Sequence, residues 1–445
     1  MTEPVRARLG ASDPGQPTQV VPGVRVVLDA RPLQEPDRAP LTAIYLGGLL
    51  GAFDAAPLAG ESFALLLQSD LDDPTERFGR LTVVGRRLLP PTRLLRSGAL
   101  TVDPFLLTGA SIGAAWRAER GGAAGSVYHA VGGAIPLASG LPLVVTLLDL
   151  APWELPHAYQ SGTVARFGQR LRGRLLRDAA AVIVGTQAVA TIVRRLLKIR
   201  RDRIRVIELA PRPAFAFWGQ ADGAGPGTPA GGRAGRQTAD PRAERERLGL
   251  PERYVVYSGR YDARQDIGTL LRALAELTRE DRPTGLPTDA PWPPRVLFAG
   301  ASPDDRAALA RAAAREGVGE ALAYAPRLDD ARLATLVRGA RAILLPTVSD
   351  GAGLAAIEAI ACGTPVVASA VGALPEIVGA AGILVGPRDS GRLASALATA
   401  YADDRVQGQL AATARERAET DGRTWADVAA ETRAVYAAVG RRGQT

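Results

Sequence analysis

One carboxylate, Glu358, stands alone in a stretch that is otherwise uncharged between Asp350 and Glu376. Its sequence neighbours are apolar, so the side chain is expected to be largely removed from water. An ionised group in that setting costs several kcal/mol unless something pairs with it. Glu358 must therefore either reach solvent at the opening of a site or have a hydrogen-bonding partner. The hydroxyls of a nucleotide ribose would be such a partner.

The residues around Glu358 predict a strand, a turn, a helix and a second strand. These elements are expected at residues 342–345, 347–353, 354–362 and 366–368, with Gly363 closing the helix. Two parallel strands joined in this way form a right-handed crossover, and its turn lies at the carboxyl end of the sheet, where open α/β folds bind ligands. The amino terminus of the helix is suited to a diphosphate.

The composition narrows the class of protein. A chain of 445 residues with 47% apolar composition can bury substantial cores and is expected to form two domains. The balance of 54 basic to 46 acidic residues and the 5% aromatic content argue against a nucleic-acid binder. The single cysteine, Cys362, excludes an intramolecular disulfide and fits a reducing, cytoplasmic compartment. The longest apolar run, residues 141–148, is far shorter than the roughly 18 residues of a membrane span.

Short apolar strands alternate with longer helical segments, which predicts doubly wound parallel sheets. Strands are expected at residues 24–29, 63–67, 81–84, 127–130, 143–146, 181–184, 254–258, 295–299, 342–345, 366–368 and 383–385. Residues 1–22 are expected to be a disordered leader, and they lack the apolar core of a signal peptide. The rest of the chain is expected to form a first domain at 23–215, a flexible linker at 216–250, a second domain at 251–422 and a closing helix at 423–445.

The segment from Ser349 to Ser369, followed by residues 374–378, resembles the donor-binding signature of family 4 retaining glycosyltransferases. In that family two acidic residues with seven others between them frame a loop and a helix. The resemblance implies that Glu358 binds the donor ribose and that Asp350 lies near the donor sugar. The turn that carries Asp350 adds Gly351, Gly353 and Leu354 to the implied donor site.

The resemblance is weaker over the rest of the chain. Residues 25–33 resemble the family's opening strand, and residues 424–425 with the helix after them resemble its closing element. The implied architecture is the GT-B fold, in which two Rossmann-like domains with helix-flanked parallel sheets face each other. The first domain would bind the acceptor, the second the nucleotide-sugar donor, and the last helix would return to the first domain. Fold similarity alone does not establish chemistry.

The loop after the strand at 254–258 is a plausible phosphate loop. It contains Gly259, Arg260 and Arg264. The family places an arginine and a lysine here, where their charges offset the diphosphate and the departing nucleotide. Gln265 stands where the lysine is expected. Solvated loop arginines are the alternative interpretation.

Asp149 follows the strand at 143–146 and is a candidate catalytic residue together with Asp350. The family often has a histidine just before this aspartate, but here the residue is Leu148, which cannot exchange a hydrogen bond. A turn or helix cap is the alternative role for Asp149. His129 near another strand end could face the cleft or be a structural histidine.

A helix is expected near residues 162–178, and within it residues 166–177 form a basic amphipathic segment with Phe167, Leu171 and Leu175 on one side and arginines elsewhere. Such a helix could contact an anionic membrane or a lipid-linked acceptor, or it could be an ordinary surface helix.

The leading hypothesis is a retaining glycosyltransferase that moves a sugar from a nucleotide-sugar donor to an unknown glycan or lipid-linked acceptor. No metal-ligand cluster is visible, and no cofactor beyond the donor substrate is expected. The rival is a glycosyltransferase-like binding or assembly subunit with reduced or no catalysis, motivated by Leu148, Gln265 and Asp350. An enzyme of another GT-B class, such as a sugar-nucleotide epimerase, is a more remote alternative.

Overall fold

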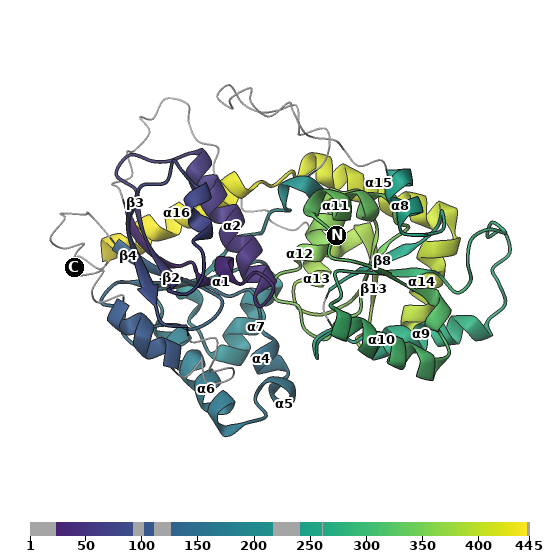
Figure 1. Ribbon diagram of the computed structural model, residues 1–445, viewed down its shortest axis with the longest axis horizontal. Coiled ribbons are helices and arrows are strands. Elements are labelled where there is room, and N and C mark those ends of the chain that lie inside the picture. Colours follow the sequence, from purple (N-terminus) through teal and green to yellow (C-terminus); the bar gives the residue numbers. More distant parts are fainter. Residues whose placement is uncertain (1–23, 92–101, 111–125, 217–240, 260, 443–445) are drawn as a thin grey trace, which may run out of the picture.

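The chain is described by a computed structural model that covers residues 24–91, 102–110, 126–216, 241–259 and 261–442. The expected leader at 1–22, Arg260 and most of the expected linker lie outside the described residues. Two parallel sheets with flanking helices form two domains side by side (Figure 1). The predicted fold class, two Rossmann-like α/β domains, is therefore confirmed.

The sheet of the first domain has the order β3-β2-β1-β4-β5-β6-β7, and every adjacent pair is parallel. Its strands are β1 (Arg25–Asp29), β2 (Ser62–Gln68), β3 (Val83–Leu89), β4 (Ser126–Val131), β5 (Leu143–Thr146), β6 (Ala181–Val184) and β7 (Ile204–Val206). The predicted pattern contained all of these except β7, although the strand predicted at 81–84 overlaps β3 only at Val83 and Val84. That strand lies in an arginine-rich stretch, and none of its three residues is fully buried, so it lacks the apolar signal of its neighbours.

The sheet of the second domain has the order β10-β9-β8-β11-β12-β13. Its strands are β8 (Val255–Ser258), β9 (Val296–Ala299), β10 (Leu322–Ala325), β11 (Ile343–Leu345), β12 (Val366–Ser369) and β13 (Gly382–Val385). The short strand β10 at the sheet edge was not predicted. The direction of winding reverses between β8 and β11, and ligands of doubly wound folds bind outside the carboxyl ends of strands at such a switch point.

Helices cover both faces of each sheet, because successive strand residues point to opposite faces and both sets are apolar. Among the described residues, the helices of the first domain are α1 (Arg31–Gln34), α2 (Pro40–Ala55), α4 (Ala151–Glu154), α5 (Pro156–Tyr159), α6 (Thr163–Asp178) and α7 (Gln187–Leu197), and residues 102–110 are helical as well. Those of the second are α8 (Pro241–Arg247), α9 (Ile267–Arg279), α10 (Pro303–Glu316), α11 (Asp330–Gly339), α12 (Leu354–Ala361), α13 (Leu374–Val378), α14 (Ser390–Ala402) and α15 (Asp404–Thr420).

The last helix, α16 (Trp425–Arg442), lies on the first domain, where it packs against α2 and β4 (Figure 1). Trp425 meets Tyr45 edge to face, with 5.7 Å between the ring centroids. A Cβ at Gly48 would stand only 2.3 Å from the Trp425 ring, so the glycine is what lets the indole lie against α2.

The backbone crosses between the domains twice. The first crossing is residues 207–216, here called the connector, and the second is residues 421–424 between α15 and α16. Leu209 and Ala210 of the connector belong to a core of the first domain, whereas Phe215 is buried in a core of the second. The connector is thus packed at both ends.

Candidate functional site

Two loops meet at the switch point of the second sheet. One follows β8 and contains Gly259 and Arg264; the other follows β11 and contains Thr347. The main chain of Val348 donates to the Arg264 carbonyl at 2.8 Å, and the Thr347 hydroxyl donates to the same oxygen at 2.8 Å. The sequence-predicted residues of these loops are therefore brought together at the carboxyl edge of the sheet.

Asp350 organises the turn that leads into α12. Its Oδ1 accepts hydrogen bonds from the main-chain N–H groups of Ala352 at 3.0 Å and Gly353 at 2.6 Å. Burial raises the pKa of the Asp350 carboxyl, and these two hydrogen bonds oppose that effect. Gly353 has φ +63°, a left-handed conformation that a glycine adopts without strain. Leu354 then begins the helix and is buried.

Glycines let other segments approach this turn closely. A Cβ at Gly372 would lie 1.7 Å from the Asp350 carbonyl oxygen, so only glycine fits beneath the turn. A Cβ at Gly351 would lie 2.7 Å from the carbonyl oxygen of Leu148, which belongs to the first domain. The turn of the second domain is therefore in direct contact with the loop after β5.

Arg264 links the domains by charge. Its Nη1 lies 3.0 Å from Oδ2 of Asp149, and its Nη2 lies 3.0 Å from Oδ2 of Asp262. Burial lowers the pKa of Arg264, but the charges and hydrogen bonds of these carboxylates raise it overall. Asp149 also accepts from the Ala151 main chain at 2.9 Å, which is the turn-capping role left open by the sequence.

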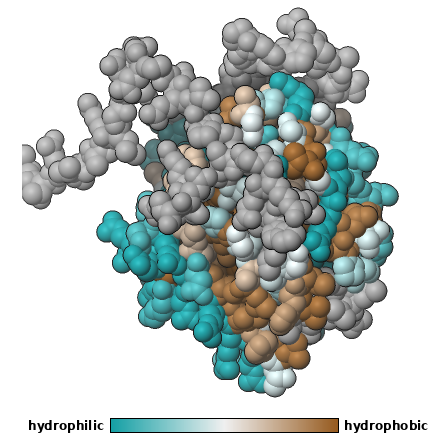
Figure 2. All heavy atoms as spheres, turned by 90° about the vertical axis from the view of Figure 1, so that its left-hand side faces the viewer, coloured by the Kyte–Doolittle hydropathy of each residue, from teal (hydrophilic) through white to brown (hydrophobic). Residues whose placement is uncertain are grey.

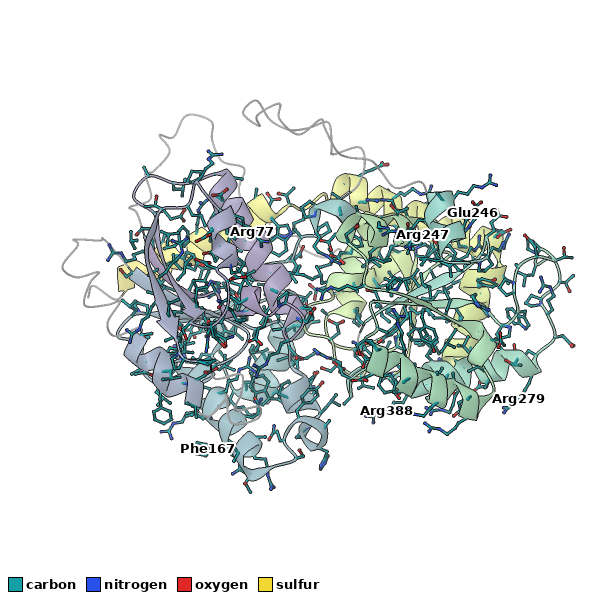
Figure 3. The ribbon with its side chains drawn as sticks, viewed as in Figure 1. Arg77, Phe167, Glu246, Arg247, Arg279 and Arg388 are labelled. Atoms are coloured by element: carbon teal, nitrogen blue, oxygen red, sulfur yellow. The ribbon has the colours of Figure 1, made fainter. Side chains whose placement is uncertain are left out.

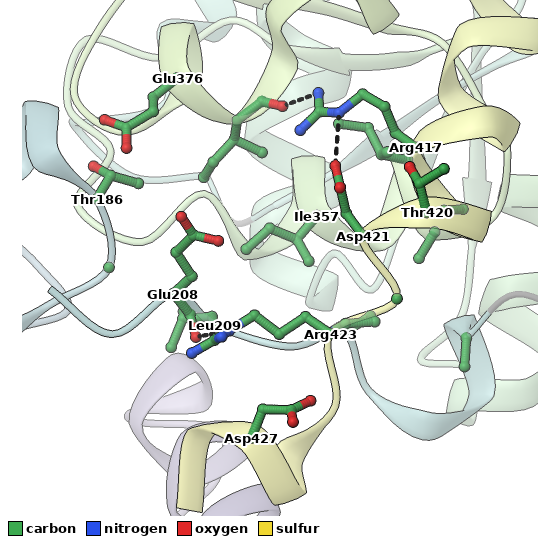
Figure 4. Close-up of a pocket in the computed structure, with 18 residues that line it drawn as sticks. Thr186, Glu208, Leu209, Ile357, Glu376, Arg417, Thr420, Asp421, Arg423 and Asp427 are labelled. Carbon is green, nitrogen blue, oxygen red and sulfur yellow. Dashed lines mark hydrogen bonds and ion pairs between the residues drawn. The ribbon is translucent and has the colours of Figure 1, made fainter. Parts of the chain in front are cut away.

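Two more contacts join the domains near the same edge. The Ser349 hydroxyl donates to Oε2 of Glu154 at 2.5 Å. Glu376 of α13 accepts from the main-chain N–H groups of Gln187 at 3.1 Å and Ala188 at 2.8 Å. A carboxylate at the amino terminus of α7 satisfies helix donors that have no partner within the helix. Glu376 lies close to Thr186 of the first domain in Figure 4.

Glu358 is buried, as its apolar neighbours predict, and is 5% exposed. Its carboxylate is paired with Arg212 of the connector: Nε lies 2.6 Å from Oε1 and Nη2 lies 2.8 Å from Oε2. The Nη1 of Arg212 lies 2.5 Å from Oδ1 of Asp330 at the start of α11. The partner of this carboxylate within the protein is therefore an arginine from a distant part of the chain.

His129 lies in the core rather than the cleft. Its ring nitrogens lie 2.6 Å from the Tyr436 hydroxyl and 2.8 Å from the Thr146 hydroxyl. Burial lowers its pKa to about 3, so the ring is neutral. The structural role that the sequence left open is the one observed.

Gln265 accepts a hydrogen bond from the buried Tyr257 hydroxyl at 3.3 Å. A Cβ at Gly259 would lie 2.7 Å from that same hydroxyl, so the glycine leaves room for the tyrosine at the base of the loop. The residue that replaces the family's lysine therefore supports the loop from within.

A cavity of about 670 Å³ lies between the two crossings, and its lining includes Ile357 of α12, Glu208 of the connector and Asp421 of the second crossing (Figure 4). Its charged groups largely bond to other protein groups: Arg423 donates to the Glu208 carbonyl at 2.6 Å, and Arg417 donates to the Ile377 carbonyl at 2.6 Å. Because Asp350, Glu358 and Arg264 are not among the residues that line this cavity, we place the candidate site at the switch point.

Sequence reasoning missed the interdomain partners, above all Arg212 and Glu154. In a chain with 54 basic residues, no local signal distinguishes one connector arginine from the others. Glu376 was visible within the signature but had no assigned role. Among the described residues, no cluster of three or more His, Cys, Asp or Glu side chains could hold a metal ion. Over the same residues, no helix is both long and apolar enough to cross a bilayer.

Two solved structures are similar to this protein over nearly its whole length. Over 93% of this chain and 98% of that chain, the structure is similar to sucrose-phosphate synthase from Thermosynechococcus elongatus, with a TM-score of 0.66 and 21% identity. It is also similar to Anabaena HepE in complex with UDP, over 93% of this chain and 99% of that chain, with a TM-score of 0.61 and 18% identity. The fold is that of the two-domain GT-B glycosyltransferases.

Sequence similarity concentrates in the second domain. Residues 252–403 match the family "Glycosyl transferases group 1". A D-inositol 3-phosphate glycosyltransferase of Streptomyces bingchenggensis (strain BCW-1) is 35% identical over 213 residues, which is 47% of this chain and 44% of that protein. The chain thus spans less than half the length of this curated relative. The family match contains Asp350, Glu358 and Arg264 of the candidate site.

The contact between Gly351 and Leu148 predicts that Gly351→Ala loosens the closed arrangement of the domains. The added Cβ would meet a backbone oxygen at 2.7 Å, so one of the two loops must move. Hydrogen exchange of residues 148–154 should become faster. Gly386→Ala is the matched control, since nothing lies within 4 Å of its added Cβ. Unchanged protection of residues 148–154 in Gly351→Ala would show that the contact does not hold the domains together.

Proposed function

We propose that the protein is a retaining glycosyltransferase of family 4 that transfers a sugar from a nucleotide-sugar donor to an acceptor. The observation that carries the proposal is the position of the acidic signature: Asp350 and Glu358 frame a turn and helix at the switch point of the second sheet. Ligands of doubly wound folds bind at such points. The match of this domain to glycosyl transferases group 1 and the UDP in the similar HepE structure support the same assignment.

In the proposed site, Glu358 accepts hydrogen bonds from the ribose hydroxyls. The amino terminus of α12 and the Gly351–Gly353 turn lie where the diphosphate and sugar would bind. Arg264, together with Arg260 outside the described residues, would offset the diphosphate charge. Because Arg264 is engaged by Asp149 and Asp262, donor binding would exchange a carboxylate partner for a phosphate, which offers the same bidentate geometry.

The proposed chemistry is a substitution on one face of the sugar. The bond from the anomeric carbon to the diphosphate oxygen breaks, the acceptor oxygen bonds to the same face, and its proton passes to the departing phosphate. Arg264 would stabilise the charge that develops on that phosphate. Asp350 and Asp149, on opposite sides of the interdomain contact, would orient the donor sugar and the acceptor. No step requires a metal or a further cofactor.

The direct test is turnover of a panel of nucleotide sugars with candidate glycan and lipid-linked acceptors. We expect nucleoside diphosphate release that depends on the acceptor, with NMR of the product showing the anomeric configuration of the donor. Inversion would contradict the proposed mechanism. Binding of donors without release across the whole panel would instead indicate a binding or assembly subunit.

The ribose assignment predicts that Glu358→Gln weakens nucleotide binding. Loss of hydrogen bonds to a charged group costs about 1.5–3 kcal/mol, or roughly ten- to a hundredfold in affinity. Isothermal titration calorimetry with UDP, GDP and ADP measures the loss for whichever nucleotide the native protein binds. Glu419→Gln, at an exposed position of α15, is the control. Equal affinities in the two variants would remove Glu358 from the donor site.

We further propose a cytoplasmic enzyme whose first domain contacts an anionic membrane surface through α6. Val164 and Phe167 are 48% and 56% exposed, and Phe167 points outward from the lower edge of the domain (Figure 3). Among the described residues, neither Arg166 nor Arg170 nor Arg174 forms an ion pair. Figure 2 views the molecule from the side of the first domain, and in the lower part of this face hydrophobic residues lie beside hydrophilic ones. Exposed apolar groups among cations suit an anionic bilayer.

The membrane proposal predicts co-sedimentation with phosphatidylglycerol vesicles but not with phosphatidylcholine vesicles. The double substitution Phe167→Ala and Arg170→Glu should reduce the bound fraction several-fold, because it removes both an apolar anchor and a cation. The control is Arg279→Glu, since Arg279 lies on the second domain, far from α6 (Figure 3). If both variants sediment equally, α6 is an ordinary surface helix.

A further inference from the structure

The Glu358 carboxylate is held from outside the βα units that form its own domain. Arg212 contacts both of its oxygens, at 2.6 Å and 2.8 Å, and the two side chains are 17% and 7% exposed for Arg212 and Glu358. This is the bidentate geometry in which an arginine binds a carboxylate most firmly. A pair so little exposed is weakly screened by solvent or salt.

Both domains determine where Arg212 lies. On one side, Leu209 and Ala210 are packed into the core of the first domain. On the other side, the Arg212 guanidinium lies 4.6 Å from the centroid of the Phe215 ring, and that ring is buried in the second domain. Arg338 of α11 donates to the carbonyl of Ala214 at 2.7 Å and so fixes the same part of the connector. The guanidinium is therefore anchored rather than free to leave.

A carboxylate with two oxygens has about four lone-pair positions, and Arg212 uses three of them: two through its side chain and one through its main-chain N–H, which lies 3.4 Å from Oε1. The remaining position, on Oε2, can accept a hydroxyl. We propose that Arg212 is a positioning residue for nucleotide binding, which keeps Glu358 charged and turns its free lone pair toward the ribose. This inference rests on the proposed function, because it requires Glu358 to be the ribose ligand.

The ionisable groups around Glu358 are Arg212 from the connector, Asp330 from α11 and the thiol of Cys362 from the end of its own helix. Burial raises the pKa of Glu358, and the hydrogen bonds and charge of Arg212 oppose that rise, while Asp330 adds to it. Without Arg212, the pKa of Glu358 would rise further. The carboxyl group would then take up a proton at a higher pH, and the neutral form accepts hydroxyls less well.

The experiment measures affinity for UDP, GDP and ADP by calorimetry between pH 6 and pH 9 in native protein, Glu358→Gln, Arg212→Met and Arg212→Lys. For the nucleotide that binds, the affinity of Arg212→Met should fall about tenfold for each pH unit below the raised pKa of Glu358, and it should recover as the pH increases. The affinity of the native protein should depend less on pH. The pH dependence of Arg212→Lys, which keeps a positive charge, should lie between these two. If Arg212→Met does not fold, the affinity profile of Arg212→Lys alone decides.

Further variants separate the possible outcomes. The double variant of Arg212→Met with Glu358→Gln should bind no more weakly than Glu358→Gln alone, because Arg212 acts through Glu358. Asp330→Asn, which changes another partner of Arg212, should stay within about threefold of native affinity. If Glu358→Gln weakens binding but the Arg212 variants match or exceed native affinity at every pH, the role of Arg212 is overturned and the ribose assignment stands. If Glu358→Gln has native affinity, the ribose assignment itself fails.

Discussion

A buried carboxylate cannot stay charged without a counter-charge, and much of this structure follows from how that constraint is met at Glu358. The counter-charge is Arg212, which comes from the connector between the domains and not from the surrounding sheet and helices. The pair therefore links α12, the helix of the acidic signature, to the connector, which joins the two domains. Removing Arg212 would leave the Glu358 charge buried and unpaired, whereas Arg212 without Glu358 would still be paired with Asp330.

Polar contacts join the domains at the carboxyl edges of their sheets, beside two buried alanines of the second domain, Ala352 and Ala373, that pack in cores of the first. Asp149 meets Arg264, Glu154 meets Ser349, and Glu376 binds the amino terminus of α7. Contacts of this kind can open and re-form at modest cost because each group can be satisfied by water when it is released. For the proposed function, contacts that can open in this way suit a cycle in which a donor enters, is enclosed and leaves.

Much of the fold could be predicted from the chain itself. Strands that are fully or almost fully buried, such as β6 and β5, are short and mainly apolar, and their predicted bounds agree with the observed ones. The strands that escaped prediction, β7 and β10, lie at sheet edges, where burial demands fewer apolar residues. The turn and helix around Asp350 were predictable because glycine, aspartate and an apolar run stand in a local order that few other structures satisfy.

The sequence by itself determined the alternation of strands and helices, the place of Asp350 in the turn after a strand and of Glu358 in the helix that follows, and the burial of Glu358 among apolar neighbours. These are local properties, set by residues within a few positions of one another. Only the tertiary structure decided what meets those side chains: Arg212 at Glu358, Asp149 at Arg264, and Tyr436 at His129. Such partners lie far apart along the chain, and any of many arginines could pair with a given carboxylate until the packing of two cores brings one of them within bonding distance.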